Sequence, residues 1–177
     1  MSARLTLRTA TRAEHDRVDT QFSAHDLASR DGYARFLATQ AGAHLPVERA
    51  VEAAGAAELL ADWPLRRRAD ALLADLGELG VAPVAEQNFE LFRGEASLLG
   101  AIYVLEGSRL GGAVLRRQIS AGLPARFLSP GAPGAWRMLT DLLDERLRPP
   151  AALDEAIASA RAVFACFEAA GSRPPES

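Results

Sequence analysis

Apolar residues recur at spacings of three and four along almost the whole chain, and this periodicity restricts it to helical folds. No segment shows the alternation of a β-strand, and neither a repeat nor a linker divides the chain. The pattern therefore predicts an all-α, single-domain bundle. Its helices are expected at about residues 5–22, 30–51, 63–79, 86–120, 135–147 and 151–170.

Local signals refine these helices. Ser29 is suited to cap the second helix, and Pro46 is expected to bend it. A glycine cluster is expected to interrupt the fourth helix, and loops are expected at Pro124 and over residues 129–134. We expect one domain over residues 1–170 and a disordered tail over residues 171–177. The third helix begins at Trp63 and is expected to present one apolar stripe made of Leu65, Leu72, Leu73, Leu76 and Leu79.

Charge and composition exclude several classes of protein. A net charge of −3 over 177 residues gives no electrostatic basis for binding nucleic acid or an anionic membrane. The chain has one cysteine, Cys166, so it cannot form an intramolecular disulfide. The first residues lack the apolar stretch of a secretory signal, and no apolar run is expected to be long enough to span a bilayer. These features predict a soluble, cytoplasmic protein.

The first predicted helix carries a histidine on a defined face. Arg8, Thr11 and His15 follow one another at spacings of three and four, so they share one side of the helix. Asp19 lies at i+4 from His15 and is placed to accept a hydrogen bond from one imidazole nitrogen, which leaves the other free to bind a metal. Taken alone, these residues fit a half-buried helix with a surface ion pair better than they fit a metal site.

The other two histidines lack metal-binding partners in the sequence. His25 is expected in the turn after the first helix, and His44 is expected to satisfy the backbone near Pro46. No H-x-x-x-H or E-x-x-H pair exists, so an iron held by one histidine needs a macrocycle for its remaining ligands.

The middle of the fourth predicted helix is poor in side chains. Gly107, Gly111 and Gly112 lie within the apolar run AIYVLEGSRLGGAVL. A glycine inside a helix costs about 1 kcal/mol relative to alanine, so three cost roughly 3 kcal/mol and need a compensating role. Gly107 and Gly111 are one turn apart, and the bare backbone they leave suits either a flat ligand or a closely packed helix.

Three segments together resemble the haem (heme) oxygenases, specifically the bacterial biliverdin-forming type associated with bacteriophytochromes. They are the N-terminal L-R-x-A-T-x-x-x-H, the segment WPLRRRADALLADLGELG that begins at Trp63, and YVLEGSRLGG that begins at Tyr103. The resemblance covers nearly the whole chain. It implies an all-α bundle with haem between a proximal N-terminal helix and a glycine-kinked distal helix. It also implies cleavage of haem to biliverdin, with release of carbon monoxide and ferrous iron, by dioxygen and external electrons.

On the proximal side, the resemblance implies that His15 is the iron ligand and that Asp19 is its hydrogen-bond partner. Thr11 belongs to the same motif and is expected at the haem. Arg8 matches a basic residue of the family that contacts a haem propionate. Every basic side chain in this chain is arginine, whose guanidinium suits carboxylates.

On the distal side, Gly107 and Gly111 are implied to bring backbone close to the iron-bound oxygen, and Gly112 is expected beside them. Without side chains there, ordered water is placed to donate a proton. Ser108 follows the first distal glycine, where the animal enzymes carry an aspartate of the water network. The route of the proton therefore stays open at this point.

Further haem contacts are implied outside these two motifs. Phe164 resembles an aromatic residue of the C-terminal helix that lines the pocket. Tyr103 lies near a family tyrosine that faces the propionates. The second propionate is expected to meet an arginine of the penultimate helix, for which Arg137 and Arg146 are both candidates.

Two alternatives stand beside an active oxygenase. One is a haem- or bilin-binding protein without turnover, and the other is a cofactor-free bundle like the thiaminases, against which the presence of His15 argues. The family implies an electron donor such as a ferredoxin or a reductase, and a bacteriophytochrome that accepts biliverdin. Arg35, Arg66, Arg67 and Arg68 would suit an acidic ferredoxin, but a solvated helix face is the expected role.

Overall fold

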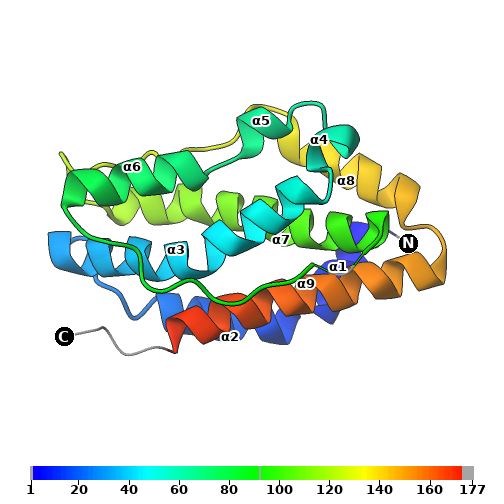
Figure 1. Ribbon diagram of the computed structural model, residues 1–177, viewed down its shortest axis with the longest axis horizontal. Coiled ribbons are helices and arrows are strands. Elements are labelled where there is room, and N and C mark those ends of the chain that lie inside the picture. Colours follow the sequence, from blue (N-terminus) through cyan, green and yellow to red (C-terminus); the bar gives the residue numbers. More distant parts are fainter. Residues whose placement is uncertain (1, 92, 173–177) are drawn as a thin grey trace.

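The computed structural model describes residues 2–91 and 93–172, and within these ranges every regular element is a helix (Figure 1). The three longest helices form the body of the bundle: α3 (Arg30–Ala53), α7 (Glu95–Leu115) and α9 (Pro150–Gly171). Helix α9 packs against α1, α2, α3 and α7. The shorter elements are α1 (Ala3–Ala10), α2 (Arg12–Phe22), α4 (Ala56–Leu59), α5 (Trp63–Arg66), α6 (Ala69–Leu79), the 3₁₀ helix η1 (Arg116–Gln118) and α8 (Ala135–Arg146).

Helix α7 lies at the centre of the bundle. Residues Glu95–Gln118 have the length and hydropathy of a membrane span, so the expectation that no apolar run is long enough is wrong. Half of that segment's most apolar window is buried inside the protein. Gly100 shows how closely α7 approaches α9, since a Cβ there would lie 2.1 Å from the carbonyl oxygen of Ala156. The hydropathy of α7 therefore matches its place in the core.

The first predicted helix is divided in two at Thr11. This residue leaves the helical conformation, and its hydroxyl donates to the carbonyl oxygen of Leu7 at 2.8 Å. At the same break, the guanidinium of Arg161 in α9 donates to the carbonyl oxygen of Ala10 at 2.9 Å. The side chains of Thr11 and Arg161 therefore satisfy the carbonyl groups at the break between α1 and α2.

Helix α3 begins as predicted, because the Ser29 hydroxyl accepts a hydrogen bond from the backbone of Gly32 at 3.0 Å. Pro46 lies inside this helix and has no N–H to donate to Gly42 one turn earlier. The free carbonyl oxygen of Gly42 accepts instead from the backbone N–H of Gln87 at 2.8 Å. The carbonyl group that Pro46 leaves free is therefore the point at which a distant segment bonds to α3.

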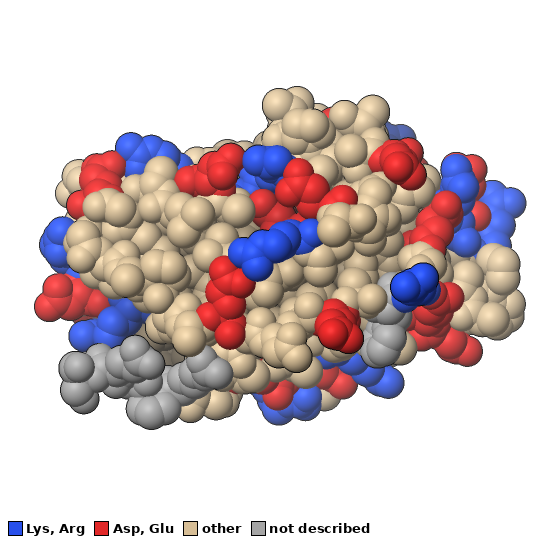
Figure 2. Space-filling model, viewed as in Figure 1, with Lys and Arg blue, Asp and Glu red and all other residues tan. Residues whose placement is uncertain are grey.

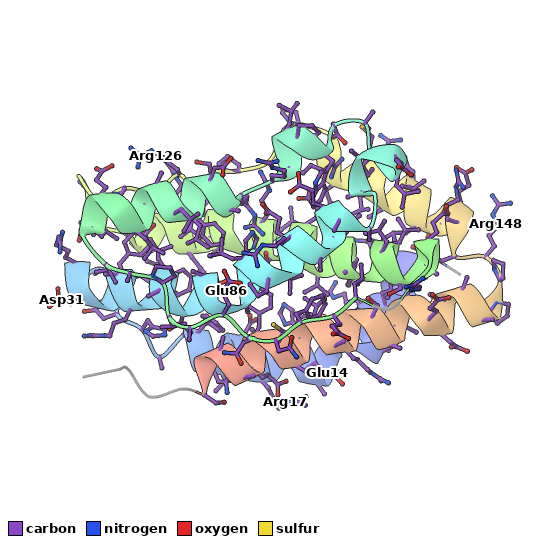
Figure 3. All side chains as sticks on the ribbon, viewed as in Figure 1. Glu14, Arg17, Asp31, Glu86, Arg126 and Arg148 are labelled. Atoms are coloured by element: carbon purple, nitrogen blue, oxygen red, sulfur yellow. The ribbon has the colours of Figure 1, made fainter. Side chains whose placement is uncertain are left out.

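That segment, residues 80–91, runs as an extended strap over α3 and α9 (Figure 1). The prediction of helix from residue 86 is wrong here. Two further hydrogen bonds join the strap to α3. The backbone N–H of Val84 donates to the carbonyl oxygen of Ala38, and the guanidinium of Arg49 donates to Glu86 of the strap. Figure 3 labels Glu86 over α3. The described backbone of the strap uses helix carbonyls of α3 as partners, so it needs no helix of its own.

Two further predictions on the helices need correction. The helix expected over residues 63–79 is broken at Arg67 and Arg68, so Leu65 lies apart from the stripe and is exposed. Leu73 is exposed as well, whereas Leu72, Leu76 and Leu79 are buried. The glycine cluster does not interrupt α7, which continues as α-helix to Leu115. Of the predicted tail, Gly171 ends α9, and residues 173–177 lie outside the described residues.

Candidate active site

Helix α2 presents His15 at the protein surface. The side chain is 56% exposed, and its Nδ1 lies 3.3 Å from the carboxylate of Asp19 and 3.6 Å from that of Asp16. Among the described residues, no side chain bonds to Nε2 of the same ring. The imidazole therefore has one nitrogen oriented by carboxylates and one free to bind a ligand.

Helix α9 supports α2 beneath His15. The ring of Phe164 packs edge-on against the imidazole, with 6.0 Å between ring centres. On α2, Arg17 pairs with Glu168 at 2.9 Å, and Glu14 pairs with Arg161 at 3.4 Å. Glu14 and Arg17 are labelled beside α2 in Figure 3. These contacts fix the histidine-bearing helix to the helix that also packs against α7.

On α7, Gly107 and Gly111 present bare backbone to open space. A Cβ at Gly111 would meet nothing within 4 Å, and one at Gly107 would meet only the Trp136 ring at 3.9 Å. Leu110 and Val114, on the neighbouring turns, are about half exposed. An open glycine face flanked by exposed apolar side chains is suited to a flat apolar ligand.

Gly112 and Ser108 lie on other sides of α7. Gly112 is buried, and a Cβ there would lie 3.2 Å from the Leu128 side chain, so its lack of a side chain serves close packing. Ser108 accepts a hydrogen bond from the Arg68 guanidinium at 2.6 Å and donates to the carbonyl oxygen of Leu105 at 2.7 Å. The serine thus connects the glycine segment to a side chain of the interior.

Tyr103 lies one turn before Gly107, and its ring lies 6.0 Å from that of Trp136. Burial raises the pKa of the Tyr103 hydroxyl, and the positive charges of Arg8 and Arg4 oppose that rise. Arg4, one turn before Arg8, had no expected role from the sequence. Thr11, the third residue of the predicted face, is instead buried at the break between α1 and α2.

The two candidate arginines of α8 differ in position. Arg137 adjoins Trp136, whose ring lies beside Gly107, and its own side chain is 87% exposed. Arg146 lies at the other end of α8 and pairs with Glu95, the first residue of α7, at 3.3 Å. Arg137 therefore lies at the end of α8 that carries Trp136, and Arg146 lies at the end that pairs with the start of α7.

Polar side chains from α3, from the start of α6 and from α7 form one connected group that no local pattern in the sequence indicates. His44 and Glu48, one turn apart on α3, are joined by a hydrogen bond of 2.9 Å from Nε2 of the imidazole. Glu48 also accepts from the backbone N–H groups of Arg68 at 2.8 Å and Ala69 at 2.9 Å. The Arg68 guanidinium then reaches Ser108. We call the three buried side chains His44, Glu48 and Arg68, together with the exposed Ser108 that Arg68 reaches, the buried relay.

Burial lowers the pKa of His44, although Glu48 opposes the effect. Burial also lowers the pKa of Arg68 to about 10, with a further contribution from the charge of Arg109. At neutral pH the relay therefore consists of a neutral imidazole, a carboxylate and a guanidinium.

The expectation of a solvated arginine face is wrong for two of its four members. Arg66 and Arg68 are buried, and Arg66 pairs with Glu106 of α7 and Asp62, both at 2.8 Å. Arg67 pairs with an exposed carboxylate, and Arg35 is exposed. On the face shown in Figure 2, positive and negative side chains are intermingled, so no patch of a single sign covers it.

Among the described residues, no cluster of three His, Cys, Asp or Glu side chains is able to hold a metal ion by itself. An iron bound here through His15 would therefore need ligands from a bound macrocycle. The free Nε2 of His15 and the unfilled glycine face fit such a group.

The fold places the chain in a class of all-helical oxygenases. It superposes on the haem oxygenase of Neisseria meningitidis, known in NO- and CO-bound forms, with a TM-score of 0.82 and 28% sequence identity. The match covers 97% of this chain and 90% of that one. The haem oxygenase of Leptospira interrogans matches with a TM-score of 0.71 over 97% of this chain and 99% of that one, and its 18% identity supports the fold alone.

Sequence comparison identifies the family. The haem oxygenase of Xanthomonas campestris is 38% identical over 122 residues, which cover 63% of this chain and 73% of that protein. The haem oxygenase PigA of Pseudomonas aeruginosa is 33% identical over 146 residues, which cover 76% of this chain and 73% of that protein. No protein-family model matches the chain. The chain belongs to the haem oxygenase family.

Proposed function

We propose that this protein is an enzyme that cleaves haem to biliverdin, with release of carbon monoxide and ferrous iron. The observation that carries the proposal is the combination of a carboxylate-oriented histidine on α2 with an unfilled glycine face on α7. Bound haem would supply the iron at which dioxygen is activated and the ring carbon that is oxidised, so it is cofactor and substrate at once. Family membership favours turnover over haem or bilin binding alone.

His15 is the proposed proximal ligand. The carboxylates of Asp19 and Asp16 face Nδ1, so they hold the tautomer whose proton is on Nδ1 and whose Nε2 lone pair is free. Phe164 supports the ring from below. The histidine is thereby oriented before haem arrives, which reduces the entropy that binding costs.

Gly107 and Gly111 form the proposed distal wall. Because neither carries a side chain, backbone would face the ligand with room for ordered water, and the Trp136 ring lies 3.9 Å from the place of a Gly107 Cβ. Ser108 follows directly, and its hydrogen bond to Arg68 connects the distal wall to the buried relay. The relay thus supplies the polar groups that the missing distal aspartate would otherwise provide.

The propionates are proposed to lie near Tyr103, Arg8 and Arg4. Arg8 and Arg4 are close enough to influence the Tyr103 hydroxyl and are suited to bind carboxylates. Arg137 is the α8 arginine that we retain for the second propionate. These contacts would determine which ring carbon is presented to the distal wall.

The family further suggests an external electron donor, such as a ferredoxin or a reductase, and a bacteriophytochrome as acceptor of biliverdin. We include both in the proposal as partners. We also propose that the protein acts in the cytoplasm, where its single cysteine, Cys166, would stay reduced.

A matched pair of histidine variants tests the ligand assignment. His15→Ala should abolish the haem absorption typical of histidine coordination and stop biliverdin formation. His25→Ala, which alters a histidine of the turn after α2, should leave both unchanged. An unaltered haem spectrum in His15→Ala would refute the assignment of the proximal ligand.

A further inference from the structure

The loop after α7 closes over the buried relay with a single aromatic side chain. Phe127 is 2% exposed, and its ring lies edge-on to the His44 imidazole with 5.1 Å between ring centres. The same ring lies 4.8 Å from the guanidinium carbon of Arg68. One side chain therefore contacts both the neutral imidazole of His44 and the guanidinium of Arg68, and the contact with Arg68 has the geometry of a cation–π interaction.

This cover isolates a polar atom that has no partner. Nδ1 of His44 is buried and has no hydrogen-bond partner among the described residues, while Nε2 of the same ring donates to Glu48. A buried acceptor without a partner would gain a hydrogen bond from any water that reached it. Phe127 is the aromatic ring in edge-on contact with this imidazole, which is itself 1% exposed.

The position of Phe127 depends on Asp75 of α6. Residues 125–129 form no helix, so the loop has no backbone ladder to hold the ring in place. Asp75 is fully buried and uses both oxygens on this loop: one accepts from the backbone N–H of Phe127 and the other from the guanidinium of Arg126, both at 2.9 Å. Figure 3 labels Arg126 above α6.

The same loop segment contacts the distal helix. Leu128 packs against Gly112 so closely that a Cβ there would lie 3.2 Å from it. Arg116, at the end of α7, bonds to the carbonyl oxygen of Ala125. A displacement of the loop would therefore disturb the relay and the glycine segment of α7 together.

We propose that Asp75 is a positioning residue that holds Phe127 as a cover over the buried relay, keeps water from His44, and thereby fixes Arg68 and Ser108 against the distal wall. This inference rests on the proposed function, because the relay is assigned a part in haem cleavage. Asp75 acts through Phe127 and touches no reacting atom.

The test compares three variants. Asp75→Asn removes the charge and one acceptor, and Phe127→Ala removes the cover while the backbone N–H to Asp75 remains. Glu78→Gln is the matched control, because Glu78 pairs with the same Arg126 at 2.8 Å on the surface, whereas the backbone N–H of Phe127 bonds to Asp75. Far-UV circular dichroism establishes that each variant is folded. If Phe127→Ala fails to fold, Phe127→Leu replaces it, since leucine keeps apolar bulk but lacks the ring.

The first measurement uses the protein without haem. NMR titration of the His44 ring should show its midpoint rising toward that of an ordinary histidine in Asp75→Asn and in the Phe127 variant, because water reaches Nδ1. The groups that face this ring are Glu48, Arg68 and Arg109. Amide hydrogen exchange of Ser108 through Gly112 should accelerate in the same variants. Both quantities should stay at wild-type values in Glu78→Gln.

The second measurement uses haem and a reductant under air. Biliverdin formation should fall about tenfold in Asp75→Asn and in the Phe127 variant and should not change in Glu78→Gln. A wild-type His44 titration and wild-type amide exchange in both altered proteins would overturn the proposal. A wild-type protein that fails to convert haem would instead refute the proposed function, and the haem-free measurements would still decide whether Phe127 is the cover.

Discussion

Replacement of Glu48 by glutamine should destabilise the protein by about 3 kcal/mol at neutral pH. Its carboxylate accepts three hydrogen bonds, from His44, from the backbone of Arg68 and from that of Ala69, at 2.8–2.9 Å. Glutamine keeps one acceptor oxygen, but its amide N–H₂ group replaces the other oxygen and faces an N–H donor with which it cannot bond. The loss of one or two bonds to a charged acceptor costs about 1.5–3 kcal/mol each.

The same hydrogen bonds also determine the pKa of Glu48. Burial raises this pKa, but the hydrogen bond and charge of His44 and the two backbone N–H groups outweigh burial and lower it from 4.5 to about 2. Each unit of pKa corresponds to about 1.4 kcal/mol, so the fall corresponds to roughly 3 kcal/mol of stability. Because the pKa is lower in the folded state, this contribution is complete above pH 4.5 and is lost as the pH falls toward about 2.

Urea unfolding at neutral and at acidic pH measures the effect. Glu86→Gln is the control, because this carboxylate is partly exposed and pairs with a surface arginine, Arg49, so its loss should cost less than about 1 kcal/mol. The Glu48 variant should also lose less stability than the wild type between pH 4.5 and about 2. A free energy of unfolding that falls no more for Glu48→Gln than for Glu86→Gln would refute this account of the relay.

Other substitutions test the distal helix and the strap. Gly111→Leu should leave the fold intact and block haem binding, because nothing lies within 4 Å of a Cβ there, and hemin titration with circular dichroism checks both parts. Gly100→Ala should destabilise the fold by about 1–3 kcal/mol in urea unfolding, since its Cβ would clash with a backbone oxygen of α9. Pro46→Ala should accelerate hydrogen exchange of the Gln87 amide, because the new N–H competes for the carbonyl of Gly42.

The all-helical fold was predictable because apolar periodicity is a local property. Ser29 signalled the start of α3 through its own hydroxyl, and the loops around Pro124 were visible in composition. The breaks were less visible. The division at Thr11 is bonded by Arg161, a residue 150 positions later, and the strap is held by a carbonyl that Pro46 leaves free. Such partners are set by tertiary packing, which the local pattern does not encode.

The candidate site divides in the same way. His15, Asp19 and the open face at Gly111 could be placed from spacing and from family resemblance. The buried relay could not be placed in this way, because the local pattern of an arginine run is the same on a solvated surface as in the interior. Arg68 bonds to Ser108, 40 residues away, and its backbone bonds to Glu48, 20 residues away. A buried charge of this kind is stable only with such partners, and no local signal reports them.

The most direct test of haem oxygenase activity is an absorption titration of the purified protein with hemin, followed by a reductant under air. We expect a Soret band to form and then to decay into the spectrum of biliverdin. A Soret band that persists under reductant and air would contradict turnover and leave a haem-binding protein. The absence of any Soret band would contradict the proposal that His15 and the glycine face of α7 bind haem.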